Sequence, residues 1–311
     1  MPLTIRELRR LLAPVPGMVP AALVPPASHG REEAACITPA TLIERGPVTA
    51  RAVGLPAAWP GPVAFLDGTQ RIEVAGYVGT SPLVLAEVAA AVRERVGRDT
   101  RTVAIERRVL ALARPHVLAA AGDALAGIET VGLPDDEPGH PLQDVDEARH
   151  AVDRARGEVE RIAGDGYRRQ SPHWLVVDGS LSESPAWALD PRMVGVSKSH
   201  STLPFTGDDL VCYLQLPAGH RSSIFQPASR RHAPVFAWGL RLWPWAGRDL
   251  LYGLVRIEVA ARSESLAAAD PICRWLLAER APISAPDGRW DRLLYGIRGV
   301  EEYLRAVRGE R

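Results

Sequence analysis

The sequence predicts an α/β fold in which a mixed β-sheet is flanked by helices, with further elements at the N-terminus and a helical elaboration. Apolar runs of strand length recur along the chain, and two of them end in an Asp-Gly pair. Between those two runs lies a long segment with the period of an amphipathic helix. Strands and helices that alternate in this way are typical of a sheet covered by helices.

The chain of 311 residues is long enough for one large domain or for one domain with an elaborated insertion. We predict a proline-rich arm with a short helix over 1–60 and a catalytic domain over 61–311. Residues from about 80 to 165 are predicted to form a helical insertion in that domain.

The N-terminal half is predicted to contain a helix at 5–12 and a strand pair at 63–78, with a tight turn at Asp67-Gly68. Residues 83–96 are predicted to be helical. The segment 101–113 begins like a strand and fits either type of element beyond its start.

The C-terminal half begins with a polar loop at 132–144 and a predicted helix from 145 to about 164. The last element is a predicted helix with Asp287 as its N-cap. Apolar runs of strand length lie between these two helices, at 173–181, 193–201, 210–216, 234–243 and 250–261.

Two of the predicted strands end alike, in Leu66-Asp67-Gly68-Thr69 and in Val177-Asp178-Gly179-Ser180. An aspartate at the end of a buried strand has its carboxylate held by rigid backbone, and the following glycine leaves space beside it. Converging carboxylates form an all-oxygen site, which suits Mg²⁺ or Mn²⁺. Either Asp-Gly pair alone is better explained as a hairpin turn, whereas two of them with an acidic helix between favour a site.

The helix between these strands carries two candidate carboxylates, Glu158 and Glu160. If Val159 is the centre of the apolar face, the two glutamates flank it at about 100° on either side. The rest of that face tilts slightly towards Glu158, which we therefore prefer. The alternative is that both are solvated helix residues.

The order of these elements is that of the ribonuclease-H-like fold, in which the first strand, the first helix and the fourth strand supply metal-binding carboxylates. Asp67, Glu158 or Glu160, and Asp178 stand in that order. In such sites two divalent ions about 4 Å apart bind the attacking water and the leaving oxygen of a phosphodiester.

Lys198 is the only lysine among the chain's 37 lysine and arginine residues, and it comes straight after a short apolar run. Lysine is a compact point charge, whereas the guanidinium group of arginine is a broad planar fork. The position therefore predicts a cation that adds positive charge to the reacting phosphate or orients the nucleophile. The alternative is a lysine left by chance in an arginine-rich composition.

The motifs VAFLDGT, GEVERIAG, HWLVVDGSL and MVGVSKSH resemble the NurA nuclease family, from about Val63 to the C-terminal helix. The resemblance implies a ribonuclease-H-like core, a homodimer, dependence on Mn²⁺ or Mg²⁺, and cleavage of DNA ends together with the hexameric HerA ATPase. It implies that Asp67 and Asp178 are metal ligands, with a glutamate upstream that matches Glu158 or Glu160. Lys198 stands where the family has a lysine.

The chain departs from the family near its C-terminus, where many members carry a histidine in an Ala-His pair that is missing here. Asp291 is a candidate for the last carboxylate ligand, or else an acid in the first turn that complements the helix dipole. His200 would share a strand face with Lys198 and is a second candidate, although a surface or structural role explains it better.

The leading functional hypothesis is a metal-dependent DNA nuclease that works with a HerA-like motor in DNA end processing, repair or anti-phage defence. The alternative is a weak or inactive adaptor of the same fold that docks on and regulates the motor. Another ribonuclease-H-like enzyme, such as a guide-dependent slicer or a transposase-type nuclease, is a third hypothesis, although no basic guide-binding region is evident. The only lysine is not in a Walker A motif, so any ATP-driven step belongs to a partner.

Composition excludes several other classes of protein. The formal net charge is zero, so no global polyanion-binding signature exists, and DNA binding has to come from a local site. Three well-separated cysteines argue against a disulfide framework and a zinc site. No apolar run reaches membrane-spanning length and no signal-peptide core is evident, so we expect a cytoplasmic protein.

Overall fold

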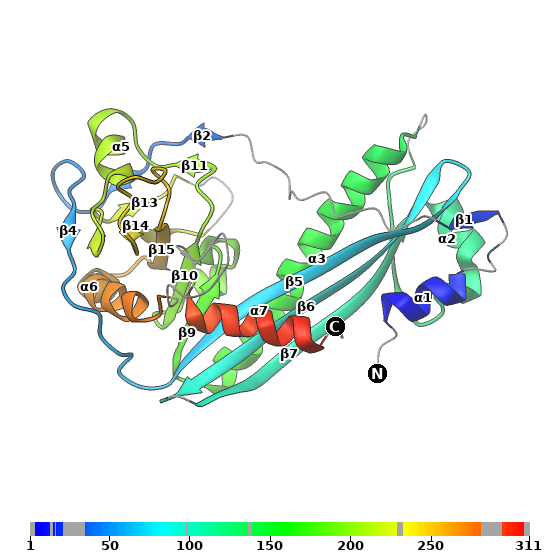
Figure 1. Ribbon diagram of the computed structural model, residues 1–311, viewed down its shortest axis with the longest axis horizontal. Coiled ribbons are helices and arrows are strands. Elements are labelled where there is room, and N and C mark those ends of the chain that lie inside the picture. The colour runs from blue at the N-terminus through cyan, green and yellow to red at the C-terminus, as the bar shows by residue number, and fades with distance from the viewer. Residues whose placement is uncertain are drawn as a thin grey trace. The chain divides into compact units, whose positions relative to one another are not determined.

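The computed structural model describes residues 4–12, 15, 17–20, 35–97, 99–135, 139–228, 233–280 and 294–307. The chain forms two compact units: unit 1 comprises 1–31, 68–91 and 104–165, and unit 2 comprises 32–67, 92–103 and 166–311. Three of the limits between them fall inside long strands, and a fourth falls inside the long helix at Pro141–Gln170 (Figure 1). The division into an arm over 1–60 and a domain over 61–311 stays a prediction.

Unit 1 is built on parts of the three long strands, which lie in the order β5-β6-β7, with the short strand β8 beside β7. Strand β1 pairs antiparallel with β5, and β8 pairs parallel with β7. The elements that lie wholly or partly in this unit are α1 (Ile5–Leu12), β1 (Met18–Pro20), β5 (Val63–Val78), β6 (Ser81–Val96), β7 (Asp99–Ala113), α2 (Pro115–Ala121), the 3-10 helix η1 (Gly122–Leu125), β8 (Glu129–Gly132) and α3 (Pro141–Gln170).

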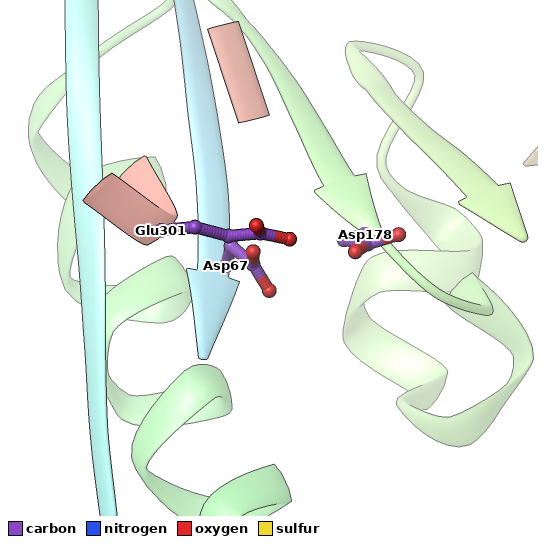
Figure 2. Close-up of side chains that lie close together, drawn as sticks. All are labelled: Asp67, Asp178 and Glu301. Carbon is purple, nitrogen blue, oxygen red and sulfur yellow. The ribbon is translucent and has the colours of Figure 1, made fainter. Parts of the chain in front are cut away.

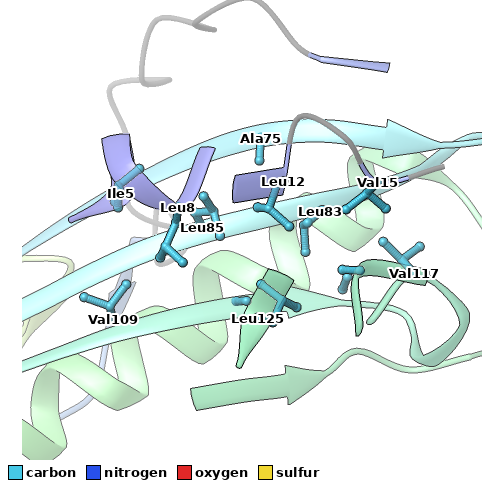
Figure 3. Close-up of a cluster of buried hydrophobic side chains, with 13 residues drawn as sticks. Ile5, Leu8, Leu12, Val15, Ala75, Leu83, Leu85, Val109, Val117 and Leu125 are labelled. Carbon is cyan, nitrogen blue, oxygen red and sulfur yellow. The ribbon is translucent and has the colours of Figure 1, made fainter. Parts of the chain in front are cut away.

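Helices cover both faces of the unit 1 sheet. On one face, Gln70 Nε2 of β5 donates to Asp153 Oδ1 of α3 at 2.7 Å. On the other face, α1 packs against residues of β5, β6 and β7 and against α2 (Figure 3). The core on that face is a cluster of small and branched side chains: Ile5, Leu8, Leu12, Val15, Ala75, Leu83, Leu85, Val109, Ala111, Ala113, Val117, Ala121 and Leu125.

The segment 83–96, expected to be helical, is part of strand β6, and that expectation is wrong. Residues 82–92 are all buried, because helices cover both faces of this central strand. The run therefore lacks the alternation that marks a half-exposed strand, and its alanines and leucines favour a helix by propensity. Packing outweighs that local preference.

The expected tight turn at Asp67-Gly68 is also absent, because β5 runs without a break from Val63 to Val78. The chain reverses direction at Gly79 instead. The φ angle of Gly79 is 60°, a left-handed conformation that favours glycine. Asp67 therefore lies within a long strand and is held by extended backbone on both sides.

Unit 2 contains a mixed sheet in the order β3-β13-β14-β15-β10-β9-β5. Strand β9 pairs parallel with both β5 and β10, whereas β15 pairs antiparallel with β10 and β14. Its further elements are β2 (Cys36–Ile37), β3 (Thr41–Leu42), β4 (Arg51–Ala52), β9 (Trp174–Asp178), η2 (Leu181–Glu183), α4 (Pro185–Leu189), β10 (Met193–Ser197), β11 (Thr202–Leu203), α5 (Gly207–Leu214), β12 (His220–Arg221), β13 (Phe225–Gln226), β14 (Val235–Arg241), β15 (Leu254–Ala260), α6 (Ser263–Ala278) and α7 (Tyr295–Val307).

Helices α5 and α6 cover opposite faces of this sheet. Trp238 Nε1 of β14 donates to Cys273 Sγ of α6 at 3.0 Å. The neighbouring residue Gly239 points to the other face, where a Cβ would come within 2.7 Å of the Tyr213 ring of α5. The observed mixed sheet flanked by helices confirms the predicted fold class.

Helix α5 replaces the strand expected at 210–216. Asp208 and Asp209 lie in its first turn, where they complement the helix dipole. Tyr213 is fully buried, while Val211 is half exposed, as on an amphipathic helix. The valine, cysteine and tyrosine of this segment favour strands, so composition alone misleads here.

Glu94 of β6 joins the end of α3 to the start of β9. Its side chain accepts hydrogen bonds from Tyr167 and His173, each at 2.9 Å, and from Arg101 at 2.7 Å. Burial by itself would raise the pKa of Glu94, but the hydrogen bonds from His173, Arg101 and Tyr167 lower it to about 2.

This network predicts a loss of stability in acid. Because the folded pKa lies below the ordinary 4.5, the contribution is complete above that pH and is lost as pH falls towards 2. The free energy of unfolding, measured by urea titration at pH 6 and pH 3, should fall by about 2 kcal/mol more in wild type than in Glu94→Gln. Equal losses in the two proteins would contradict this assignment.

No helix in the described ranges combines the length and the apolar composition needed to cross a membrane.

Candidate metal site

The parallel pairing of β5 and β9 brings two aspartates to the same edge of the unit 2 sheet. Leu66 lies opposite Val177 in this parallel pair. Asp67 and Asp178 are the next residues of the two strands, so they lie side by side. The residues before them are buried, which fixes the backbone at both positions. Asp67 is only 5% exposed, and the Asp178 side chain is 22% exposed. The two paired strands therefore place one buried and one accessible carboxylate together.

Glu301 of α7 adds a third carboxylate to this pair. One carboxylate oxygen from each of Asp67, Asp178 and Glu301 lies within 4.8 Å of the other two. The three side chains point towards one another from β5, β9 and α7 (Figure 2). The Glu301 side chain is 13% exposed and lies 3.5 Å from the guanidinium group of Arg305, one helical turn away.

Close packing of α7 on β5 brings the Glu301 carboxylate to Asp67 and Asp178. A Cβ at Gly296 would overlap the ring of Phe65, so only glycine lets the helix approach the strand at this distance. Arg93 of β6 donates to the Gly299 carbonyl at 2.7 Å, and its guanidinium carbon lies 5.4 Å from the Tyr303 ring centroid. These contacts hold the turn of α7 that carries Glu301.

Lys198 places a cation on the same group of carboxylates. Val196 of β10 lies opposite Asp178, and Lys198 follows two residues later. Its Nζ donates to Asp178 Oδ2 at 2.8 Å, and its side chain is 21% exposed. Three carboxylates and one ammonium group thus form a compact charged site.

The glycines that follow the two aspartates serve different purposes. Gly68 is extended, and a Cβ there would overlap the carboxylate of Glu160 from α3. Gly179 has a φ of 129°, which disfavours other residues. The backbone conformation at Gly179 therefore favours glycine, and the missing Cβ at Gly68 leaves room for the Glu160 carboxylate.

The segment after Asp178 is anchored by Glu258 of β15, which sequence reasoning missed. Glu258 is 2% exposed and accepts hydrogen bonds from Ser180 Oγ at 2.6 Å and from the Leu181 amide at 2.9 Å. Arg256 pairs with it at 3.1 Å. These bonds fix the path of the chain as it leaves the candidate site.

The two glutamates predicted on α3 have different surroundings. The Glu158 side chain is 48% exposed and pairs with Arg108 at 2.8 Å. Glu160 is 14% exposed, pairs with Arg156 at 2.8 Å and lies against Gly68, the residue after Asp67. Neither belongs to the group of three carboxylates. Their predicted role as helix ligands stays a prediction.

The two additional candidates are placed as follows. His200 Nε2 lies 3.0 Å from the Leu254 carbonyl, so this ring atom is engaged with the backbone of β15. Asp291 lies outside the described residues. The C-terminal carboxylate in the observed group is Glu301, which shares the apolar stripe of α7 with Ile297, Val300 and Leu304. An acid on an otherwise apolar helical stripe was the signal available in the sequence.

No protein-family model matches the chain, and no curated protein sequence matches it. The crystal structure of the NurA nuclease from Sulfolobus solfataricus is similar at a TM-score of 0.51 and 10% sequence identity, over 82% of this chain and 81% of that one. A structure of human endonuclease V gives a TM-score of 0.32 at 15% identity, over 80% of this chain and 84% of that one. A second structure, of the catalytic domain of human endonuclease V, gives a TM-score of 0.34 at 16% identity, over 98% of this chain and 95% of that one.

The endonuclease V scores are too low to support an argument. The similarity to the NurA nuclease extends over most of both chains. At 10% identity it concerns the fold and not the activity. The chain therefore has the fold of the NurA nuclease.

Proposed function

We propose that this protein is a metal-dependent nuclease that hydrolyses phosphodiester bonds in DNA. The observation that carries the proposal is the convergence of Asp67, Asp178 and Glu301, whose oxygens lie within 4.8 Å of one another beside the ammonium of Lys198. The fold shared with a NurA nuclease supports the same reaction.

The donor set fits Mn²⁺ or Mg²⁺. Carboxylate oxygens are the ligands that these hard cations prefer, and the group contains no thiolate or imidazole that would favour zinc. Asp67, Asp178 and Glu301 would hold the ion. A divalent ion at such a site polarises the phosphoryl oxygen and lowers the pKa of bound water.

The protein's own groups supply position and charge. Buried strand backbone fixes Asp67 and Asp178, so neither carboxylate has to reorganise during the reaction. The Lys198 ammonium lies at a partly exposed edge of the group, where it can meet one oxygen of a DNA phosphate as negative charge develops.

Of the two α3 glutamates, Glu160 is the one that we propose to match the helix glutamate of the NurA family. It is mostly buried and lies against Gly68, whereas Glu158 is half exposed and engaged with Arg108. We expect Glu160→Gln to lower the rate of DNA cleavage by about 10-fold or more, as loss of a supporting carboxylate does. Glu158→Gln should change the rate less than about 2-fold. The reverse order would restore Glu158 as the helix ligand.

The finer parts of the proposal rest on the resemblance to the NurA family. They are a cytoplasmic homodimer, a HerA-like hexameric ATPase as partner, and a role in end resection during repair or in anti-phage defence. The alternative of a weak or inactive adaptor that regulates such a motor makes the opposite prediction about cleavage.

The test is to incubate the purified protein with end-labelled linear DNA and MnCl₂ or MgCl₂, with and without a HerA-type motor. We expect degradation that stops when EDTA is added. Intact DNA under every condition would contradict the nuclease proposal and would favour the alternative of an inactive adaptor. Degradation that EDTA does not affect would contradict the metal dependence.

A further inference from the structure

Lys198 occupies a position in the carboxylate group that a cation would otherwise fill. We propose that its ammonium takes the place of a second divalent ion, so that each chain binds one Mn²⁺ or Mg²⁺ rather than the pair expected from the sequence. This inference rests on the proposed metal-dependent function of the same site.

The position of the lysine is the first support. In two-metal sites the ions lie about 3.5–4 Å apart. Here the ammonium lies 2.8 Å from Asp178 Oδ2, and the Asp178 carboxylate also belongs to the group of three. One oxygen of Asp178 is therefore already engaged by a cation, while Asp67 and Glu301 contribute the other two carboxylates of the group.

The charges of the site are the second support. Counted over these four groups alone, the three carboxylates and the Lys198 ammonium carry a net charge of −2. One divalent ion balances that charge, and a second ion would leave the group at +2 before any DNA phosphate binds. Arg305 changes this little, because its side chain is 55% exposed and lies 3.5 Å from Glu301.

The residue type is the third support. The chain uses arginine at every other cationic position, and it has its single lysine at this site. An ammonium group is a compact point charge, similar in that respect to a metal ion, whereas a planar guanidinium with five donors is not. The geometry thus gives a physical reason for a lysine at this one position.

The test is a count of bound manganese. The full-length protein is equilibrated with MnCl₂, and free Mn²⁺ is measured by electron paramagnetic resonance. We expect one ion per chain in wild type and two in Lys198→Met, whose unbranched neutral side chain leaves the three carboxylates unbalanced. Arg305→Met, which removes the other nearby cation, is the matched control and should bind one ion.

Two ions in wild type would overturn the inference, and so would a single ion in both wild type and Lys198→Met. If Lys198→Met fails to fold, the wild-type count alone still decides, and Lys198→Ala provides a second neutral variant. DNA cleavage is measured on the same preparations. Wild type that cleaves DNA with two ions bound overturns this inference alone, whereas wild type that binds no ion and cleaves nothing overturns the proposed function as well.

Discussion

Replacing Asp178 with asparagine, or Glu301 with glutamine, is expected to lower the rate of DNA cleavage by more than about 100-fold. Both changes keep the size of the side chain and remove one of the three negative charges that converge at the site. Loss of a supporting group around a metal typically costs 10–100-fold, so loss of a direct ligand should cost more. The rate is measured with end-labelled linear DNA at saturating MnCl₂.

Glu302→Gln is the matched control for Glu301→Gln. Glu302 is the next residue on α7 and pairs with Arg298 four positions away, just as Glu301 pairs with Arg305. Its side chain is 58% exposed and lies outside the group of three carboxylates. Its replacement should leave cleavage within about 2-fold, since an exposed i,i+4 ion pair contributes little. Equal losses in the two variants would mean that Glu301 acts through the helix and not through its carboxylate.

Replacing Gly296 with alanine is expected to disable the site from a distance. The new Cβ would overlap the buried ring of Phe65, which is 1% exposed and cannot move aside. Helix α7 would have to shift away from β5, at a cost of about 1–3 kcal/mol in stability. The shift would carry Glu301 away from Asp67 and Asp178. We expect weaker Mn²⁺ binding and slower cleavage in this variant.

Gly299→Ala is the control, because it makes the same substitution one turn further along the same helix. A Cβ there would lie 3.6 Å from Arg93 Nη1, which is ordinary van der Waals contact. Alanine is the better helix former by about 1 kcal/mol, so this variant should be at least as stable as wild type and fully active. Thermal unfolding and Mn²⁺ titration of both variants test the prediction. If Gly296→Ala binds Mn²⁺ as wild type does, the docking of α7 does not position Glu301.

Local patterns predicted the parts of the candidate site that depend on which strand carries each residue. Asp67 and Asp178 each follow a run of buried apolar residues, and parallel pairing of those two strands is enough to bring them together. Lys198 follows the neighbouring strand, and its contact with Asp178 comes from the same pairing. In each case the side chain's place is decided by the strand on which it lies.

The parts that sequence reasoning missed depend on packing between distant segments. Strand β6 has the composition of a helix and becomes a strand because helices cover both its faces. Glu301 reaches Asp67 because Gly296 lets α7 lie directly on Phe65. That contact joins residues more than 200 positions apart, and no periodicity in the chain encodes it. The only signal in the sequence was Glu301, an acid on the otherwise apolar stripe of α7.

The most direct measurement of the central claim is the position of a bound metal. Crystals soaked in MnCl₂ would be examined by anomalous diffraction at the manganese absorption edge. The account predicts a peak coordinated by Asp67, Asp178 and Glu301, on the side of Asp178 away from the Lys198 ammonium. A peak bound elsewhere, or no peak at these carboxylates in crystals of an active preparation, would contradict it.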